Sequence, residues 1–384
     1  MSAPSIPKLF FSFLRLGLTA FGGPAMIAYI KELSVKQNKW LNEERFKDGV
    51  VLCQSIPGAT AMQMAGYVGL KTRGLGGALA SYVGFGLPAF MLMLLFSIVY
   101  AGYHTLSLVH SLFAGLQIIV VAIIAQATYA FGKNLAKSYR DILIIILSAG
   151  SLAIGVSPFL VIPGAGLAGI ILFKNIRSSS PVSDRIAGKW KMRQMISLVV
   201  ILLIGLTTLY FIDKDAFILS ALMMKIDLFA FGGGFTSLPL MLHEIVEVKG
   251  WLDEKTFMDG IALGQVTPGP IVITAAFVGY LLNGFIGSLV ATLSIFTPSF
   301  LLLVIIDPLF DRLKSSPFFL KATKGLLASF VGLLIYVLIK FGLAVPWDIT
   351  RVLLGVVALA ALIKKIDLLY VVIIGGIISV WLFS

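Results

Sequence analysis

The residues of this chain that could do chemistry lie where long apolar segments are interrupted by short runs of glycine and proline. These four breaks are Gly22-Gly23-Pro24, Pro57-Gly58, Gly232-Gly233-Gly234 and Pro268-Gly269-Pro270. Non-helical backbone survives in hydrocarbon only where it is buried in protein or lines a polar cavity. A helix that begins at such a break presents free N–H groups and the positive end of its dipole to an anion. The breaks therefore predict an oxyanion site built largely from main-chain donors; kinking and close helix packing are the alternative role.

Neutral side-chain donors stand beside these breaks. Gln54 and Gln265 each come three residues before the proline of a break, near one helical turn, so each amide can point at it. Gln63 and Thr267 add an amide and a hydroxyl nearby. Such groups can bind a tetrahedral dianion without a permanent charge that would hinder its release. We predict that these four side chains bind substrate; interhelical hydrogen bonding is the alternative role of each.

Two cations precede the breaks. Arg15 and Lys225 each lie seven residues before the first glycine of a break, which is about two helical turns. Either could place a supporting positive charge below the anion site. Lys225 and Asp227 are two residues apart and cannot share a helix face, so they are not predicted to form an ion pair.

Four ionisable side chains within or beside the apolar segments are candidates for proton coupling: Asp48, Asp227, His243 and Asp259. Carboxylates inside a membrane are costly and often functional, and histidine changes its charge near neutral pH. Stabilisation of a helix end is the alternative role of Asp48 and Asp259, and packing is that of His243. Asn42 and Asp253 are predicted to cap the helices that carry these two aspartates.

The breaks belong to two homologous halves. The run 40–58 recurs as 251–269 without a gap, with Trp, Leu, Glu, Phe, Asp, Gly, Leu, Gln, Pro and Gly at identical offsets. Upstream, the Ala-Phe-Gly-Gly sequence that begins at Ala20 recurs at Ala230. Duplicated halves with Gly/Pro-interrupted apolar segments are typical of secondary transporters.

Composition predicts a membrane protein. Of 384 residues, 59% are hydrophobic and only 12% are charged, whereas soluble proteins average about 25% charged residues. Continuous apolar stretches, rather than short alternating ones, recur from end to end and predict an all-α polytopic membrane protein. About thirteen segments are expected, near 9–30, 46–70, 76–101, 108–131, 142–156, 158–173, 195–212, 216–246, 257–282, 285–306, 320–343, 351–363 and 367–383.

These segments predict three parts: an N-terminal repeat at 1–175, a linker with an unpaired connecting helix at 176–215, and a C-terminal repeat at 216–384. The segment 195–212 has no counterpart in the first half. It adds one crossing, so the second half is predicted to be inverted relative to the first.

Lysine and arginine concentrate in the loops 71–75, 132–141, 174–194, 307–324 and 364–365. By the positive-inside rule, the N-terminus is predicted to be cytoplasmic and the C-terminus outside. The basic loop 31–45 fits this scheme only if the segments on either side of it turn back at their breaks. Broken or re-entrant helices are therefore expected; kinked spans are the alternative.

The sequence argues against an enzyme. It has no His/Cys/carboxylate cluster with metal-ligand spacing, no Walker A sequence and no Gly-x-Ser-x-Gly elbow. We expect no cofactor and no metal, and the single Cys53 is expected to be a packing residue. The net charge of +12 sits in loops between apolar runs and does not indicate nucleic-acid binding.

The combined motifs resemble the chromate transporter family over nearly the whole chain. In the first half they are Phe21-Gly-Gly-Pro24, Trp40-Leu-x-Glu-x-x-Phe-x-Asp-Gly49, Gln54-x-x-Pro-Gly58 and Gly76-Gly-Ala78; in the second they are Phe231-Gly-Gly-Gly234, Leu238-Pro-Leu240 and Gly264-Gln-Val-Thr-Pro-Gly-Pro270. The resemblance implies a two-domain, long-chain prokaryotic member that exports chromate, coupled to proton motive force. Two positions depart from the family: Ile27 stands where a histidine is usual, and Ala59 replaces the last proline of Pro-Gly-Pro.

We therefore expect a plasma-membrane exporter of chromate or a similar tetrahedral oxyanion that works by alternating access between the halves. Protons and bilayer lipid are the other expected partners, and a homodimer is expected by analogy alone. An oxyanion channel or sulfate carrier of the same architecture, and an intramembrane sensor without transport, are the alternatives.

Overall fold

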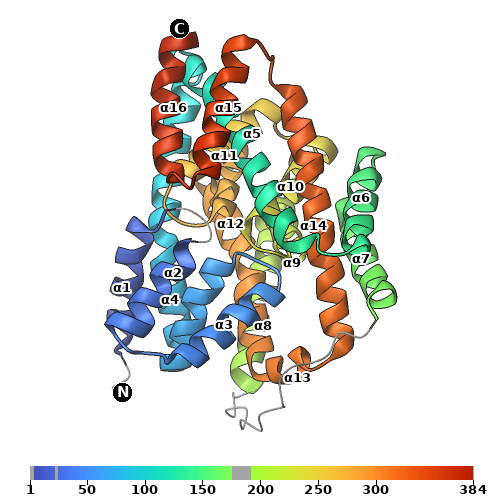
Figure 1. Cartoon of the computed structure of the whole chain (residues 1–384). Coiled ribbons are helices and arrows are strands. Elements are labelled where there is room, and N and C mark those ends of the chain that lie inside the picture. Colours follow the sequence, from blue (N-terminus) through green and yellow to red (C-terminus); the bar gives the residue numbers. More distant parts are fainter. Residues whose placement is uncertain (1–3, 22–24, 175–191, 384) are drawn as a thin grey trace.

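The computed structural model describes residues 4–21, 25–174 and 192–383, and the described chain is all-α (Figure 1). The first half contains α1 (Ile6–Thr19), α2 (Ala25–Lys31), the π-helix η1 (Glu32–Gln37), α3 (Glu43–Ser55), α4 (Thr60–Tyr103), α5 (Ser107–Leu135), α6 (Tyr139–Ala153) and α7 (Pro158–Leu172). Helix α8 (Met192–Ile212) connects the halves.

The second half repeats this order. It contains α9 (Lys214–Phe229), the 3₁₀ turn η2 (Gly234–Thr236), α10 (Ser237–Met241), the π-helix η3 (Leu242–Val248), α11 (Glu254–Val266), the 3₁₀ turn η4 (Ile271–Ile273), α12 (Thr274–Ile306), η5 (Asp307–Leu309), α13 (Phe310–Lys314), α14 (Pro317–Ala344), α15 (Ile349–Ile363) and α16 (Leu368–Phe383).

Several helices have the length and composition of membrane spans. Among the described residues, five qualify: Thr60–Tyr103, Ser107–Leu135, Met195–Ile212, Ile271–Leu309 and Pro317–Ala344. Shorter apolar helices add to these, including Pro158–Leu172, Ile349–Ile363 and Leu368–Phe383. The chain is therefore a multi-pass membrane protein, as its composition predicts.

Two of the long helices are hairpins. In α4 the chain leaves helical geometry at Arg73 and Gly74, and in α12 it does so at Asn283 and Gly284. Both turn glycines have positive φ, 66° and 53°, which glycine adopts without the cost a side chain would add. The arms of each hairpin then cross so closely that a Cβ on Gly69 would overlap the backbone of the opposite arm.

The segments on either side of two breaks run back along each other. Tyr67 of α4 donates its hydroxyl hydrogen to the carbonyl oxygen of Arg45, near the start of α3, at 3.1 Å. A Cβ on Gly49 would overlap the Tyr67 ring, and one on Gly260 of α11 would overlap the Phe277 ring of α12. The chain thus reverses direction at Pro57-Gly58 and again at the equivalent break in the second half.

The polar caps before α3 and α11 form as predicted. The Asn42 side chain accepts the N–H of Arg45 at 2.9 Å, and the Asp253 side chain accepts the N–H of Thr256 at 2.7 Å. Each cap satisfies a backbone donor that would otherwise be unpaired at the start of a helix. These helix starts fix the directions of Asp48 and Asp259, which each lie six residues after the capping residue.

Helices of each half pack against helices of the other half. Helix α5 of the first half packs against α15 and α16 of the second, where Ser379 donates its hydroxyl hydrogen to the carbonyl oxygen of Ser111 at 2.5 Å. Helix α14 of the second half packs against α6 and α7 of the first, with Gly325 directly against the backbone of Ala165. Figure 1 shows both groups flanking a centre formed by α4, α9, α11 and α12. The breaks lie within this shared centre.

Candidate functional site

A cavity of about 250 Å³ lies where the breaks of the two halves meet. Its walls come from α2, α3, the start of α4, α5, the Gly232–Gly234 turn and the end of α11 with the break that follows. The lining residues are Met26, Ile27, Gln54, Ala59, Thr60, Ala61, Phe131, Gly232, Gly233, Gly234, Phe235, Gly264, Gln265, Thr267, Gly269, Pro270 and Ile271.

Most of the residues predicted to bind substrate therefore share one cavity. Those in its wall are Gln54, Gly232, Gly233, Gly234, Gln265, Thr267, Gly269 and Pro270. Pro57, Gly58, Gln63 and Pro268 are not among its lining residues. Gly22, Gly23 and Pro24 lie outside the described residues, although Met26 and Ile27, which follow them, line the cavity.

The breaks are joined across the two halves by a pair of main-chain hydrogen bonds. The N–H of Gly58 donates to the carbonyl oxygen of Ala230 at 2.9 Å, and the N–H of Gly269 donates to that of Ala20 at 3.0 Å. Gly58 and Gly269 are equivalent in the repeat, as are Ala20 and Ala230. Each half therefore holds the break of the other in place.

Gln265 supplies a free donor to the cavity wall. Its side chain is 7% exposed, and its Nε2 has no hydrogen-bond partner among the described residues. A buried amide N–H without an acceptor costs free energy that a bound acceptor would recover. Gln54, its repeat equivalent, lines the same cavity but is exposed. The cavity is thus closed beside one glutamine and open beside the other.

Gln63 supports the first break from behind. Its Nε2 donates to the carbonyl oxygen of Pro57 at 2.7 Å and approaches that of Ser299 at 3.5 Å. The side chain is fully buried, and Oε1 has no partner among the described residues. Gln63 therefore holds Pro57 in position from behind the cavity wall and does not itself line the cavity.

Asp227 is buried beside the same break. One carboxylate oxygen accepts the N–H of Ser299 at 2.7 Å, and Ser299 Oγ lies 3.1 Å from the Tyr82 hydroxyl oxygen. Ser299 follows Pro298, whose ring interrupts the regular hydrogen bonding of α12. No cation among the described residues pairs with Asp227, and its other oxygen has no partner there. The carboxylate satisfies a backbone donor at this kink.

The equivalent aspartates Asp48 and Asp259 have different surroundings. Asp259 is buried and accepts hydrogen bonds from the Tyr100 hydroxyl and from Gln117 Nε2, each at 2.8 Å. Asp48 lies 3.7 Å from Lys314 Nζ, in α13. Neither aspartate lines the cavity.

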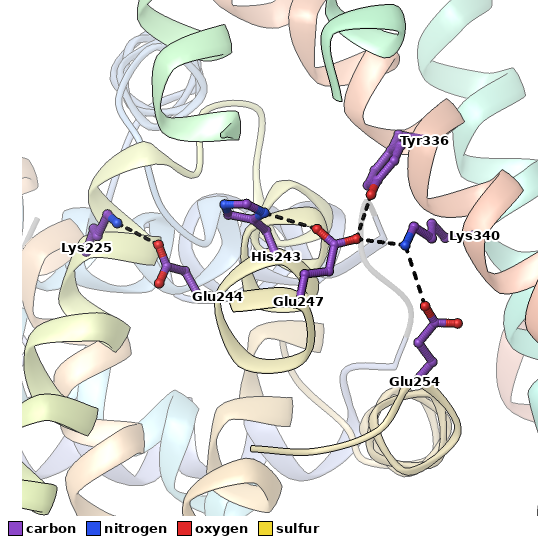
Figure 2. A network of polar contacts seen from close by, with 7 residues as sticks. All are labelled: Lys225, His243, Glu244, Glu247, Glu254, Tyr336 and Lys340. Carbon is purple, nitrogen blue, oxygen red and sulfur yellow. Dashed lines mark hydrogen bonds and ion pairs between the residues drawn. The ribbon is translucent and has the colours of Figure 1, made fainter. Parts of the chain in front are cut away.

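The predicted supporting charges are not in the cavity wall. Arg15 is exposed on α1. Lys225 pairs with Glu244 at 2.5 Å (Figure 2). Its Nζ also lies over the ring of Phe159, 3.8 Å from the ring centroid. His243 is also outside the cavity, 3.0 Å from Glu247. Among the described residues, no group of three His, Cys, Asp or Glu is arranged to hold a metal ion.

Sequence reasoning missed part of the wall. Phe131 comes from α5 and Phe235 from the turn after the third break, and their rings pack together at a centroid distance of 6.5 Å. Nothing in the sequence near Phe131 indicates that this residue lines a cavity, because α5 reaches the cavity through packing between distant segments. Ile27, which stands where the family pattern has histidine, also lies in the cavity wall.

Comparisons with known proteins agree with the motifs. A model of the chromate transporter family matches residues 7–170 and 217–380. An uncharacterized transporter of Methanocaldococcus jannaschii is 44% identical over 97% of this chain and 93% of its own. A chromate transport protein of Pseudomonas aeruginosa is 30% identical over 81% of this chain and 74% of its own. A probable chromate transport protein of Synechococcus elongatus is 27% identical, over 100% and 97%.

No solved structure matches the chain.

Proposed function

The chain belongs to the chromate transporter family, and we propose that it is a secondary transporter that exports chromate from the cell. The observation that carries the proposal is the unpaired Nε2 of Gln265 in the wall of a cavity where the breaks converge. A tetrahedral dianion offers acceptors to such a donor, and the neutral wall lets it leave again. Gln54, Thr267 and the Gly232–Gly234 turn supply the other contacts.

Membrane potential is a sufficient driving force in this proposal. Moving one elementary charge across 100 mV is worth about 2.3 kcal/mol, so a dianion gains roughly twice that on leaving a negative interior. The sequence carries no Walker A motif for nucleotide hydrolysis. We therefore propose that proton motive force, of which the membrane potential is one component, drives export.

The repeat supports a mechanism of alternating access. We propose that the two halves, 1–175 and 216–384, are inverted in the membrane, with the N-terminus cytoplasmic and the C-terminus outside. The doubled-back segments at the breaks would then be re-entrant, with their turns near the midplane. The reciprocal hydrogen bonds of Gly58 and Gly269 support this, because they place equivalent turns on either side of one axis.

We propose that the cavity also accepts sulfate. Sulfate has nearly the same charge and shape as chromate, and neutral donors discriminate weakly between them. We expect sulfate to compete for the same cavity.

Reconstitution into proteoliposomes tests the function. Chromate uptake is measured with an imposed membrane potential, with an imposed pH gradient and with neither, and sulfate is added as competitor. We expect an imposed pH gradient to drive accumulation against the chromate gradient even when the membrane potential is clamped to zero. Uptake that follows the membrane potential but not the pH gradient would identify a channel, and absence of chromate and sulfate flux would favour a sensor.

A further inference from the structure

Two equivalent helices of the repeat, α3 and α11, lead from the surface to the anion cavity. Helix α3 begins at Glu43 and reaches the cavity at Gln54, and α11 begins at Glu254 and reaches it at Gln265. With a rise of 1.5 Å per residue, each path is about 16 Å long. Figure 1 shows α11 towards the end of the molecule where α15 and α16 lie, and α3 towards the opposite end with α13. The two helices therefore approach the cavity from different ends of the molecule.

One face of α3 is exposed, whereas the same face of α11 is buried. The exposed positions of α3, spaced as neighbours on one helix face, are Lys47, Val51 and Gln54. Their repeat equivalents in α11 are Met258, Ala262 and Gln265, which are 0%, 1% and 7% exposed. Residue type alone does not explain the difference, because Val51 is apolar and is nevertheless 49% exposed. Another element must cover α11 and leave α3 uncovered.

Helix α5 provides this cover. It packs against α11, whereas its repeat equivalent α14 makes no comparable contact with α3 among the described residues. A buried carboxylate joins the elements here. Asp259 of α11 accepts hydrogen bonds from Gln117 Nε2 of α5 and from the Tyr100 hydroxyl near the end of α4, each at 2.8 Å. The acceptor belongs to the second half and both donors belong to the first, so the contact holds the halves together.

Aromatic packing completes the closure on this side. The Tyr100 ring meets the rings of Phe113 of α5 and Phe277 of α12 edge to face, with centroids 5.0 Å apart in each case. A buried carboxylate is costly unless it is hydrogen-bonded, and hydrogen bonds to a charged group are stronger than neutral ones. The contact must therefore be made fully or be replaced by water, which favours two discrete arrangements over a gradual loosening.

The equivalent aspartate of the first half does not close α3 in this way. The positions that correspond to the two donors are Phe310 and Leu327, and neither side chain can donate a hydrogen bond. Asp48 lies instead 3.7 Å from Lys314 Nζ of α13, and its side chain is 36% exposed. The structure thus has one closed side, along α11, and one open side, along α3.

We propose that Asp259, Gln117 and Tyr100 form the outer gate of the transporter, and that the structure is its inward-facing state. The proposal rests on the proposed function, because α3 follows the basic loop 31–45, which that function places in the cytoplasm. An oxyanion would enter along the open face of α3 and reach Gln54. Release of Asp259 would then let α5 leave α11 while α14 closes over α3, which opens the cavity to the other side.

Cysteine accessibility tests the two faces. The chain contains one cysteine, the buried Cys53, which Cys53→Ala removes. Val51→Cys and Ala262→Cys then place single thiols at equivalent positions of α3 and α11. A membrane-impermeant maleimide is applied to right-side-out and to inside-out vesicles. We expect Val51→Cys to react from the cytoplasmic side only, and Ala262→Cys to react slowly from both sides.

Variants of the gate should change this pattern. Tyr100→Phe and Gln117→Leu each remove one donor to the carboxylate, and each should raise the rate at which Ala262→Cys is labelled from the outer side by about tenfold. Asp259→Ala removes the acceptor of both bonds, so labelling of Val51→Cys should fall as that of Ala262→Cys rises. Asp48→Ala is the matched control, because it removes the equivalent carboxylate of the first half and should leave Ala262→Cys protected.

Several results would overturn the inference. They are a Val51→Cys thiol that does not react from the cytoplasmic side, an Ala262→Cys thiol that stays protected in every gate variant, and labelling of both thiols from the same side. Tyr100→Phe guards against misfolding as an explanation, since it keeps the ring that packs against Phe113 and Phe277. The expected labelling in a protein that transports neither chromate nor sulfate would contradict the proposed substrates and leave the gate in place.

Discussion

The N–H of Gly269 donates a hydrogen bond to the carbonyl oxygen of Ala20 at 3.0 Å, across 249 positions of the chain. The repeat reproduces this bond with the roles of the halves exchanged, as Gly58 donates to Ala230. Each break in a helix leaves backbone groups that must find partners inside the protein. Here the partner comes from the other half, so neither break is satisfied by its own repeat alone.

Substitution of Gly58 should therefore destabilise both halves. Gly58 has φ of +116°, and a Cβ there would overlap Ser299. We expect Gly58→Ala to lower the stability of the detergent-solubilised protein by about 1–3 kcal/mol through backbone strain, with any repacking cost added. Thermal unfolding followed by circular dichroism measures it.

Gly205→Ala is the control for this change. Gly205 lies within α8, has ordinary helical φ, and has open space where a Cβ would go. It should leave the unfolding temperature unchanged or slightly raised. Equal unfolding temperatures for the Gly58 and Gly205 variants would contradict the crossed arrangement of the breaks.

Local sequence signals were sufficient to predict some features of the site. The Gly/Pro runs mark where helices end, because glycine and proline are the residues that favour a helix least. Asn42 and Asp253 mark where the following helices begin, and their side chains cap those helices. Gln265 was predicted from its spacing to a proline, and it lies in the cavity wall. These helix ends, caps and spacings depend only on residues within one or two helical turns along the sequence.

Features that depend on distant packing were not predictable. Nothing in the sequence places α5 against α15 and α16, or Phe131 in the cavity wall, because those contacts join segments that are far apart in the chain. Lys225 was expected below the anion site, yet its partner is Glu244, nineteen positions away on a segment that returns past α9. A single sequence does not indicate which residues far apart in the chain contact each other.

Asp227 should contribute to stability through its acceptor oxygen. Its carboxylate satisfies the buried N–H of Ser299 beside Pro298. Asp227→Ala leaves that donor unpaired and should cost about 1–3 kcal/mol. Asp227→Asn keeps an acceptor of the same shape and should recover most of the loss. Chemical unfolding of the two variants compares them; an alanine variant as stable as the asparagine variant would show that the bond contributes nothing.

Gln265 should matter for affinity rather than for folding. Its Nε2 has no partner to lose among the described residues, so Gln265→Leu should leave the unfolding temperature within error of wild type. Loss of one hydrogen bond to a charged ligand should weaken chromate binding by about 1.5–3 kcal/mol, or roughly tenfold to a hundredfold. Gln37→Leu, at an exposed position of η1, serves as the control. Isothermal titration with chromate measures both, and equal affinity in the two variants would remove Gln265 from the site.

Ile27 offers a gain-of-function test of where the anion binds. It lines the cavity at a position where the family resemblance leads us to expect histidine, and the side chain here cannot ionise. Ile27→His should add a positive charge to the wall at low pH, so chromate should bind more tightly at pH 6 than at pH 8 by a larger factor than in wild type. Wild-type protein measured at both pH values corrects for the protonation of chromate itself. Leu18→His, on an exposed face of α1, introduces the same group outside the cavity lining and should leave the pH dependence of the affinity as it is in wild type. If both histidine variants responded alike to pH, the effect would come from net charge, and the anion would have to bind somewhere other than this cavity.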